Sequence, residues 1–244
     1  TVAAQALSML VSLIIIRKNN SLGFKVRRED IRWNKQIIGR VTSLGFPIAL
    51  QDGLVSLSFI FINAIVNTLG VVASGGVGVA EKLCTFILLA PSAYMQSLSA
   101  FVAQNVGAGE EKRARQAMFY AMMTSLAFGA VICIFTFFKG DLLAGLFAKD
   151  SDVIAAAWEY LKAYSIDSLF VSFLFCYVGY FNGIGKTRLV MIQGLAGAFL
   201  IRIPFTYVFS HIQPVSLFRI GLAIPLATVL QIVVCTIYYM WLRK

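Results

Sequence analysis

The stretch that decides the fold is residues 83–115, LCTFILLAPSAYMQSLSAFVAQNVGAGEEKRAR. Its first part, residues 83–109, contains no Asp, Glu, Lys or Arg, and a dense run of charges follows at once. A bilayer core of roughly 30 Å needs about 20 apolar residues in a helix that crosses it. The stretch is therefore typical of a transmembrane helix that ends at a charged turn.

The same pattern recurs along the chain. The uncharged runs occupy residues 53–80, 83–109, 116–138, 168–185, 203–218 and 220–242. The chain is 59% hydrophobic and 13% charged, whereas a soluble domain is about a quarter charged. Only helices and closed barrels satisfy their backbone groups in lipid, and the runs lack the apolar/polar alternation of a barrel strand. The sequence therefore predicts an all-α, polytopic membrane bundle.

The positive charges fall in every second gap between these runs. Of 21 basic residues, 15 lie on one side, 3 on the other and 3 inside apolar segments. Because Lys and Arg stay on the cytoplasmic side during insertion, we expect an integral protein of the cytoplasmic (inner or plasma) membrane with a cytoplasmic C-terminus. The net charge of +10 then indicates membrane lipids with anionic headgroups as partners. We expect no nucleic-acid partner, since no basic gap has the context of a reader domain.

The runs predict one partial span and six full ones. The full spans are expected at about 43–69, 77–107, 114–138, 153–182, 188–210 and 217–242. Residues 43–244 would then form a lobe of six transmembrane helices. Residues 1–16 are apolar and lack the charged start of a signal peptide, so they read as the end of a truncated transmembrane helix, and we expect the chain to be a fragment.

Residues 17–42 are expected to form a basic cytoplasmic linker between these parts. Ile31, Trp33 and Ile37 lie among its charges, as in a helix that rests in the headgroup plane. A solvated linker with incidental apolar residues is the alternative, and we favour the interfacial helix.

Ionisable side chains within the spans are costly and are candidate functional groups. Asp52 lies 12 residues after Arg40, or about 18 Å along a helix, close to the membrane midplane. A carboxylate there must pair with another helix, bind a cation or stay protonated. Asp167 lies about 29 Å before Lys186, in the outer half. Arg202, at comparable depth, is a candidate ion-pair partner of either aspartate, and purely structural roles for all three remain open.

Further candidates come from the second full span and from the aromatic residues. Glu81 and Lys82 open that span, and a cavity role for Glu81 competes with a solvated helix end. Tyr94, Tyr164 and Phe170 are candidate cavity aromatics, because rings attract lipophilic cations. Packing or lipid contact is the alternative for each ring.

The sequence offers no arrangement for catalysis. Its cysteines, Cys84, Cys133, Cys176 and Cys235, lie in separate apolar segments, and His211 is its one histidine. These residues form no cluster with metal-ligand spacing. The GIGKT sequence at 183–187 is not a phosphate loop, since Tyr180 stands where the motif needs glycine. We therefore expect no enzyme, no cofactor and no resident metal.

Three stretches carry a resemblance to a known family. They are SLGFPIALQDGL at 43–54, GVAEKLCTFILLAPSAYMQSLSAFVAQNVGAGEEKRARQ at 78–116 and GYFNGIGKTRLV at 179–190. They resemble the multidrug and toxic compound extrusion (MATE) family. The QNVGAG segment at 104–109, before a basic turn, is the most specific part.

The resemblance implies the C-terminal lobe of a secondary antiporter that exports cationic or lipophilic drugs in exchange for Na⁺ or H⁺. The partner implied is an N-terminal lobe that lies outside this sequence. Family members carry carboxylates on the first and fourth helices of this lobe, where Asp52 and Asp167 are the acidic residues here, so a transported Na⁺ at Asp52 or Asp167 is the one metal expected. The alternatives are a flippase of related fold for lipid-linked oligosaccharides or lipids, and a non-transporting interaction protein.

Overall fold

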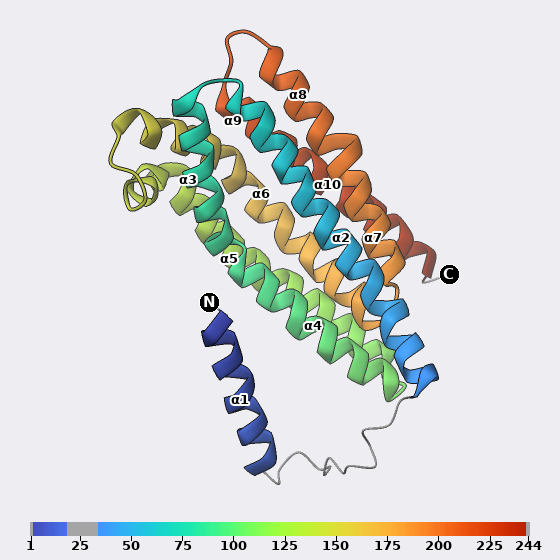
Figure 1. Cartoon of the computed structure of the whole chain (residues 1–244). Coiled ribbons are helices and arrows are strands. Elements are labelled where there is room, and N and C mark those ends of the chain that lie inside the picture. Colours follow the sequence, from blue (N-terminus) through green and yellow to red (C-terminus); the bar gives the residue numbers. More distant parts are fainter. Residues whose placement is uncertain (1, 19–33, 243–244) are drawn as a thin grey trace. The chain divides into compact units, whose positions relative to one another are not determined.

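The structure, a computed structural model, describes residues 2–18 and 34–242 (Figure 1). It divides into two units, residues 1–42 and 43–244. The first unit contains α1 (Val2–Lys18) and the start of α2. The predicted linker and interfacial helix at 17–42 fall mostly on residues 19–33, which lie outside the described residues.

The second unit is built from helices alone in its described part. They are α2 (Lys35–Asn67, from Ser43 on), α3 (Val71–Ile87), α4 (Leu89–Gly107), α5 (Glu111–Gly145), α6 (Ser151–Gly183), α7 (Thr187–Leu195), the π-helix η3 (Ala196–Arg202), α8 (Ile203–His211), α9 (Leu217–Gly221) and α10 (Ala223–Leu242). Six helical stretches of the described chain are long and apolar enough to cross a membrane. The predicted all-α bundle with six full spans is confirmed.

The second span differs from the expected single helix from 77 to 107. It begins at Val71, so residues 71–76, which lie between two of the expected spans, are helical. Gly76 has a packing role, since a Cβ there would lie 2.6 Å from the Cβ of Ala156 on α6. The span then breaks between Ile87 and Leu89. Pro91 has no N–H to donate to the carbonyl four residues earlier, which is the reason for a break at this place.

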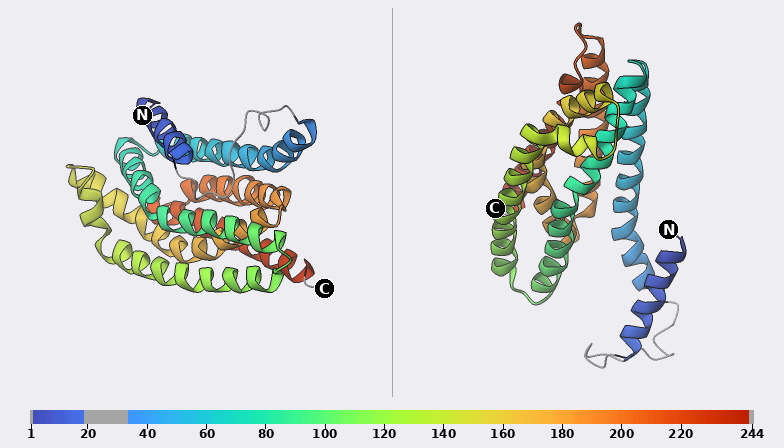
Figure 2. Two further views of the ribbon diagram at one scale, coloured as in Figure 1. Left: turned by 90° about the horizontal axis from the view of Figure 1, so that it is seen from below. Right: turned by 90° about the vertical axis from the view of Figure 1, so that its left-hand side faces the viewer.

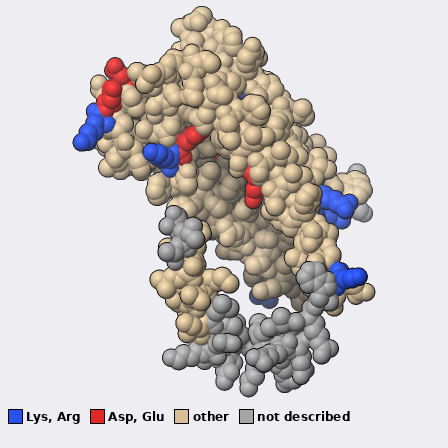
Figure 3. All heavy atoms as spheres, viewed as in Figure 1, with Lys and Arg blue, Asp and Glu red and all other residues tan. Residues whose placement is uncertain are grey.

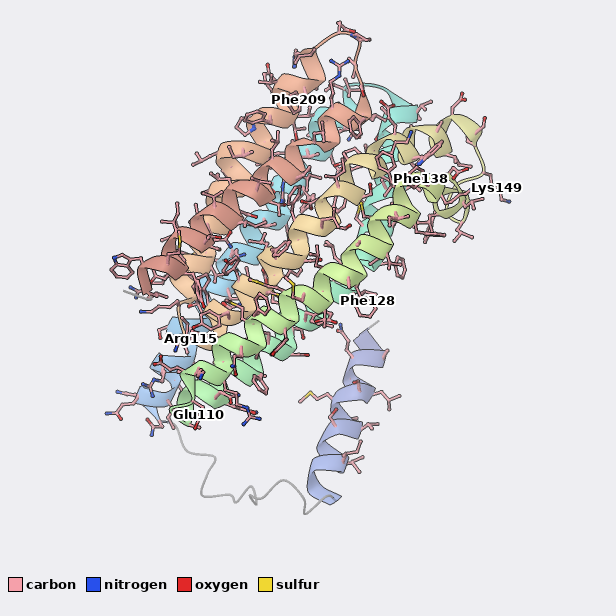
Figure 4. The ribbon with its side chains drawn as sticks, turned by 180° about the vertical axis from the view of Figure 1, so that it is seen from behind. Glu110, Arg115, Phe128, Phe138, Lys149 and Phe209 are labelled. Carbon is pink, nitrogen blue, oxygen red and sulfur yellow. The ribbon has the colours of Figure 1, made fainter. Side chains whose placement is uncertain are left out.

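The third span continues beyond its expected end at residue 138. α5 runs to Gly145, with a non-helical residue at Lys139 (φ −131°, ψ 23°). Trp158 of α6 compensates for this kink, because its indole N–H donates to the carbonyl of Phe137 at 3.1 Å. Figure 4 shows Glu110 and Arg115 at one end of α5 and Lys149 beyond its other end.

α6 is the most buried of the six candidate spans and packs against α3, α4, α5, α9 and α10 (Figure 2). Small polar residues let α5 approach it closely. The Ser168 hydroxyl donates to the carbonyl of Gly129, and the Ser172 hydroxyl donates to the carbonyl of Ser125, both at 3.1 Å. Such contacts suit helices in lipid, where packing and interhelical hydrogen bonds drive association.

Charged side chains are few on the face of the molecule drawn in Figure 3, where most of the surface is uncharged. Large apolar side chains such as Phe86, Phe138, Ile192 and Leu200 are exposed around the second unit. A surface of this kind is expected where helices meet hydrocarbon. It agrees with the membrane placement predicted from composition.

Candidate functional site

A cavity of about 250 Å³ lies inside the second unit. Its lining comes from α2, α6, the α7–η3 segment and α10, with single residues from α3–α4. The polar members are Gln51, Asp52, Asp167, Asn182, Gln193, Arg202, Thr228 and Gln231. The cavity therefore has a mostly apolar wall in which these polar and charged side chains are set.

Helical spacing explains how α2 reaches the cavity. Ile48, Gln51, Asp52, Val55 and Phe59 line it, at steps of three and four residues. Residues at this spacing share one face of an α-helix. The helix therefore presents one mixed stripe with a carboxylate and an amide near one end and an aromatic ring at the other.

α6 presents a second stripe with the same spacing. Tyr164, Asp167, Val171, Val178 and Asn182 belong to it. Asp167 is 2% exposed, whereas the Asp52 side chain is exposed in this chain. The fold thus brings both aspartates predicted from sequence to one cavity from two different helices, one shielded from solvent and one accessible.

Arg202 lines the same cavity at the end of η3. Its guanidinium lies over the ring of Phe59, 4.8 Å from the ring centre, a distance typical of a cation–π contact. Its Nε and Nη1 atoms have no hydrogen-bond partner, and neither does Oδ1 of Asp167. Arg202 and Asp167 line the same cavity. An ion pair between them stays a prediction.

The π-helix fixes where Arg202 lies. A π-turn shifts the backbone hydrogen bonds by one residue and leaves carbonyl groups without a helical hydrogen-bond donor. The Gln231 amide of α10 reaches the carbonyls of Gln193 and Gly194 at 3.4 Å each, in the turn before η3. Gly197 makes room for this amide, since a Cβ at Gly197 would collide with the Gln231 side chain. α10 therefore supports the irregular segment that carries Arg202.

Glu81 lies in a smaller neighbouring pocket of about 230 Å³. This pocket shares Phe59, Leu88 and Tyr164 with the main cavity. Asn63 of α2 donates its amide hydrogens to both carboxylate oxygens of Glu81, at 3.0 and 3.1 Å. Glu81 is thus held beside the cavity and is joined to α2 by hydrogen bonds.

The three aromatic candidates are placed differently. Tyr164 lines both the cavity and the neighbouring pocket. Tyr94 and Phe170 are not among the residues that line the cavity in the described chain. The Tyr94 ring instead lies 6.3 Å from the ring of Phe128 on α5. Phe59, over which Arg202 lies, is the second aromatic residue at the junction of the two spaces.

Within the described residues, no group of three or more His, Cys, Asp and Glu side chains is placed to hold a metal ion. The four cysteines are free, and three are buried. The groups that line the cavity are one guanidinium, two carboxylates, several amides and aromatic rings.

The MatE family model matches residues 47–208 of this chain. The chain belongs to the MATE family. The matched region runs from α2 to α8 and includes Asp52, Asp167 and Arg202. With six helices that can span a bilayer, this MATE family member is an integral membrane protein.

Curated MATE-like relatives match over most of the chain. "Probable multidrug resistance protein YpnP" of Bacillus subtilis is 25% identical over 210 residues, which cover 86% of this chain and 46% of that protein. The "FAD transporter" of Shewanella oneidensis is 25% identical over 237 residues, covering 96% and 50%. The chain therefore spans about half the length of the curated relatives it matches.

Solved structures share this MATE fold. The crystal structure of MATE in complex with MaL6 has a TM-score of 0.83 at 16% identity, over 97% of this chain and 54% of that one. A MOP superfamily transporter from Pyrococcus furiosus has a TM-score of 0.76 at 18% identity, over 82% and 44%. At these identities the similarity establishes the fold alone.

Sequence reasoning missed the amides of the cavity. Gln51, Asn182, Gln193 and Gln231 line it, and none was a candidate. The signal was present, because an amide inside an apolar span also needs a hydrogen-bond partner. A search limited to charged residues passes over such groups.

Proposed function

We propose that this chain is the C-terminal lobe of a secondary antiporter that exports cationic or lipophilic compounds in exchange for Na⁺ or H⁺. One observation carries the proposal: Asp52 and Asp167, on different helices, line one cavity within the bundle. The names of relatives such as the multidrug resistance protein YpnP support the class of substrate.

Competition for the carboxylates would couple the inward flow of the ion to the outward flow of the exported compound. A cation or proton that occupies Asp167 removes the charge that attracts a cationic substrate, so ion and substrate exclude each other. Exchange requires that each ligand bind the inward-open and outward-open states with different affinity. Cys84, Tyr164 and Phe59 around the aspartates form the apolar surroundings in which a lipophilic compound is bound.

We also propose that the lobe works with a second one. α2 is the least buried of the six candidate spans, although its stripe carries Asp52 and Gln51 into the cavity wall. A polar, exposed carboxylate on an otherwise apolar helix suits a surface that faces a partner lobe across a water-filled space. An N-terminal lobe of the same protein is the expected partner.

The orientation proposed is cytoplasmic for the end of α5 that carries Arg115. Lys112, Arg113 and Arg115 lie there, and Lys186 and Arg188 precede and begin α7. Figure 4 shows Arg115 and Lys149 at opposite ends of α5. Because basic residues concentrate on the cytoplasmic side, the C-terminus is proposed to be cytoplasmic as well, with anionic lipid headgroups as neighbours.

A lipid or lipid-linked oligosaccharide flippase is the alternative. Its substrate carries phosphate, which calls for a cationic cavity. Among the described lining residues, Arg202 is the one basic side chain, against Asp52 and Asp167. This balance favours export of cationic compounds.

The test is ethidium efflux from cells that express the complete reading frame, with a Na⁺ gradient and a pH gradient imposed separately. We expect efflux to follow one gradient and to be lost in Asp167→Asn and in Asp52→Asn. Asp152→Asn is the matched control, since Asp152 is an exposed aspartate in the first turn of α6 and lies outside the cavity.

Efflux that survives unchanged in both cavity variants would refute the role of the two aspartates. An absence of efflux under either gradient, in a correctly inserted protein, would refute the antiporter and favour the flippase. Ordinary export by Asp152→Asn would show that the change from carboxylate to amide is harmful only in the cavity.

A further inference from the structure

A groove of about 260 Å³ lies at the end of the bundle where α5 begins and α10 ends. It shares no lining residue with the main cavity. Five of its lining residues come from the first turns of α5 and one from α10: Lys112, Arg115, Gln116, Phe119, Tyr120 and Tyr239. Figure 4 shows Arg115 at this end of α5. Because α6 packs against both helices, the groove runs between two elements that a third one holds in place.

The side chains along the α5 wall of the groove follow the order of the groups in a phospholipid. The lining residues of α5 lie at steps of three and four, so they share one face of the helix. The two cations come first, and Phe119 and Tyr120 follow about one turn further along. These rings are 58% and 67% exposed, and Met123, which is 43% exposed, continues the same face. The face therefore changes from cationic to aromatic to apolar as it enters the span.

The wall that α10 contributes is packed against α6. The ring of Tyr239 lies 5.7 Å from the ring of Tyr180 and 6.1 Å from the ring of Tyr177, in both cases edge-on. Tyr180 is buried in α6, so Tyr239 rests on the core of the bundle. Tyrosine is enriched where a helix meets lipid headgroups, because its ring suits the apolar side and its hydroxyl the polar side. The groove is therefore bounded by a packed interfacial side chain on one wall.

The two cations of the groove are not neutralised within the described part of the chain. Lys112 and Arg115 have no hydrogen-bond or ion-pair partner among the described residues. The two glutamates just before Lys112 are not among the lining residues. Arg113 differs from both, because its guanidinium lies 5.6 Å from the ring centre of Phe101 on α4 and it does not line the groove. The groove thus gathers two of the three cations of this segment and suits a ligand with negative charge.

We propose that this groove binds one anionic phospholipid, with the lipid phosphate between Lys112 and Arg115. One acyl chain then lies along Phe119, Tyr120 and Met123. Arginine binds phosphate through two parallel N–H donors, and lysine adds a point charge. A free phosphate would leave the exposed aromatic and apolar part of this face uncovered, whereas a lipid covers it. This inference does not depend on the proposed transport activity, and it assigns one lipid site, distinct from the general attraction of basic segments to a membrane surface.

The test is native mass spectrometry of the protein expressed from the complete reading frame and purified in detergent. Phosphatidylglycerol, phosphatidylcholine or glycerol 3-phosphate is added, and the affinity of each is measured. Phosphatidylcholine carries no net charge, and glycerol 3-phosphate carries the phosphate without acyl chains. The variants are Arg115→Gln, Arg115→Lys and the double variant Lys112→Gln, Arg115→Gln. Arg113→Gln is the matched control, because it removes the same charge from the same segment but outside the groove.

We expect phosphatidylglycerol to bind more tightly than phosphatidylcholine. Arg115→Gln should weaken the binding of phosphatidylglycerol about fivefold and the double variant about thirtyfold, the effect of one and of two basic residues next to anionic lipid. Arg115→Lys should keep most of the affinity, since the charge remains. Arg113→Gln should change the affinity by about twofold or less, because an exposed charge outside the groove is screened. Glycerol 3-phosphate should not displace the lipid at equal concentration, since it cannot contact the rings of the groove.

Equal losses in Arg113→Gln and Arg115→Gln would overturn the site, because they would show only a general attraction between a basic surface and anionic lipid. Equal binding of phosphatidylglycerol and phosphatidylcholine would overturn the requirement for an anionic headgroup. Displacement of the lipid by glycerol 3-phosphate at equal concentration would overturn the lipid as the ligand and identify a site for free phosphate.

A second measurement needs no variant and tests the position of the site. Phosphatidylglycerol with a photoreactive group on one acyl chain is bound to the unmodified protein and cross-linked, and the labelled peptides are identified. We expect labels on α5 between Gln116 and Met123, or at the end of α10 around Tyr239. Labels confined to other helices would overturn the placement of the lipid in this groove.

Discussion

Replacing Gly179 by alanine should destabilise the bundle, although alanine is the better helix former. Gly179 lies on α6 where α4 crosses it, and a Cβ there would lie 2.6 Å from the carbonyl oxygen of Met95 and 3.1 Å from its Cα. Both atoms belong to the backbone, so no side chain can rotate away. The two helices must move apart, which disturbs the contacts along their whole crossing.

The magnitude follows from two opposing terms. Adding a methyl group to a tightly packed contact costs about 1–3 kcal/mol, and a backbone neighbour places Gly179 at the upper end. Exchanging glycine for alanine inside a helix returns about 1 kcal/mol. The net loss is therefore about 2 kcal/mol. Gly78→Ala is the matched control, since a Cβ at Gly78 on α3 would meet nothing within 4 Å and the helix term acts alone.

The assay is thermal unfolding of the purified protein in detergent, followed by the fraction that stays monodisperse. We expect Gly179→Ala to lose stability and Gly78→Ala to gain it, a separation of about 3 kcal/mol between two identical chemical changes. A Gly179→Ala protein that melts at or above the temperature of the unmodified protein would refute the close packing of α4 on α6.

Three further changes use the same unfolding assay. Trp158→Phe removes the indole donor to the carbonyl at the α5 kink and should cost about 1 kcal/mol; unchanged melting would show that this bond is not made. Gln231→Leu leaves the carbonyls before η3 without that amide and should cost about 1–3 kcal/mol; a constant melting temperature would contradict the support that Gln231 gives to this segment. Asn63→Leu deprives Glu81 of both donated hydrogen bonds and should lower the stability of the protein. The double variant with Glu81→Leu should lose less stability than the sum of the two single variants, because the two residues are coupled. Additive losses would contradict this coupling.

The sequence predicts the spans well because a bilayer imposes one simple requirement on them. Every span must be long, helical and nearly free of charge, and this property can be read without knowledge of neighbours. The predictions fail where packing against neighbouring helices determines the local structure. Residues 71–76 lie between two expected spans, but they are helical, and Gly76 packs against α6.

The site was predictable in part for the same reason. Asp52, Asp167 and Arg202 are conspicuous in apolar spans because of their cost, and the fold brings all three to one cavity. Amides such as Gln193 and Gln231 hardly interrupt an apolar run. Their roles depend on the π-helix, whose irregular hydrogen bonds no hydropathy pattern reveals.

The position of Phe170 on α6 explains why this residue is not among those that line the cavity. Successive residues of an α-helix turn by about 100°, so the cavity residues of α6 fall within roughly 20° on one side of Asp167 and 80° on the other. Phe170, three residues after Asp167, lies about 60° away on the side that the stripe barely enters. Being close to Asp167 in sequence therefore does not place its ring in the cavity.

The small residues of α6 mark the side of this helix that packs against other helices. They are Ser165, Ser168, Ser172, Gly179 and Gly183, all about 100–160° from Asp167 around the helix. Ser168 and Ser172 contact the backbone of α5, and Gly179 and Gly183 contact the backbone of α4. Because close helix crossings in lipid need small side chains, this stripe must face α4 and α5. The side that adjoins this stripe and carries Asp167 lines the cavity.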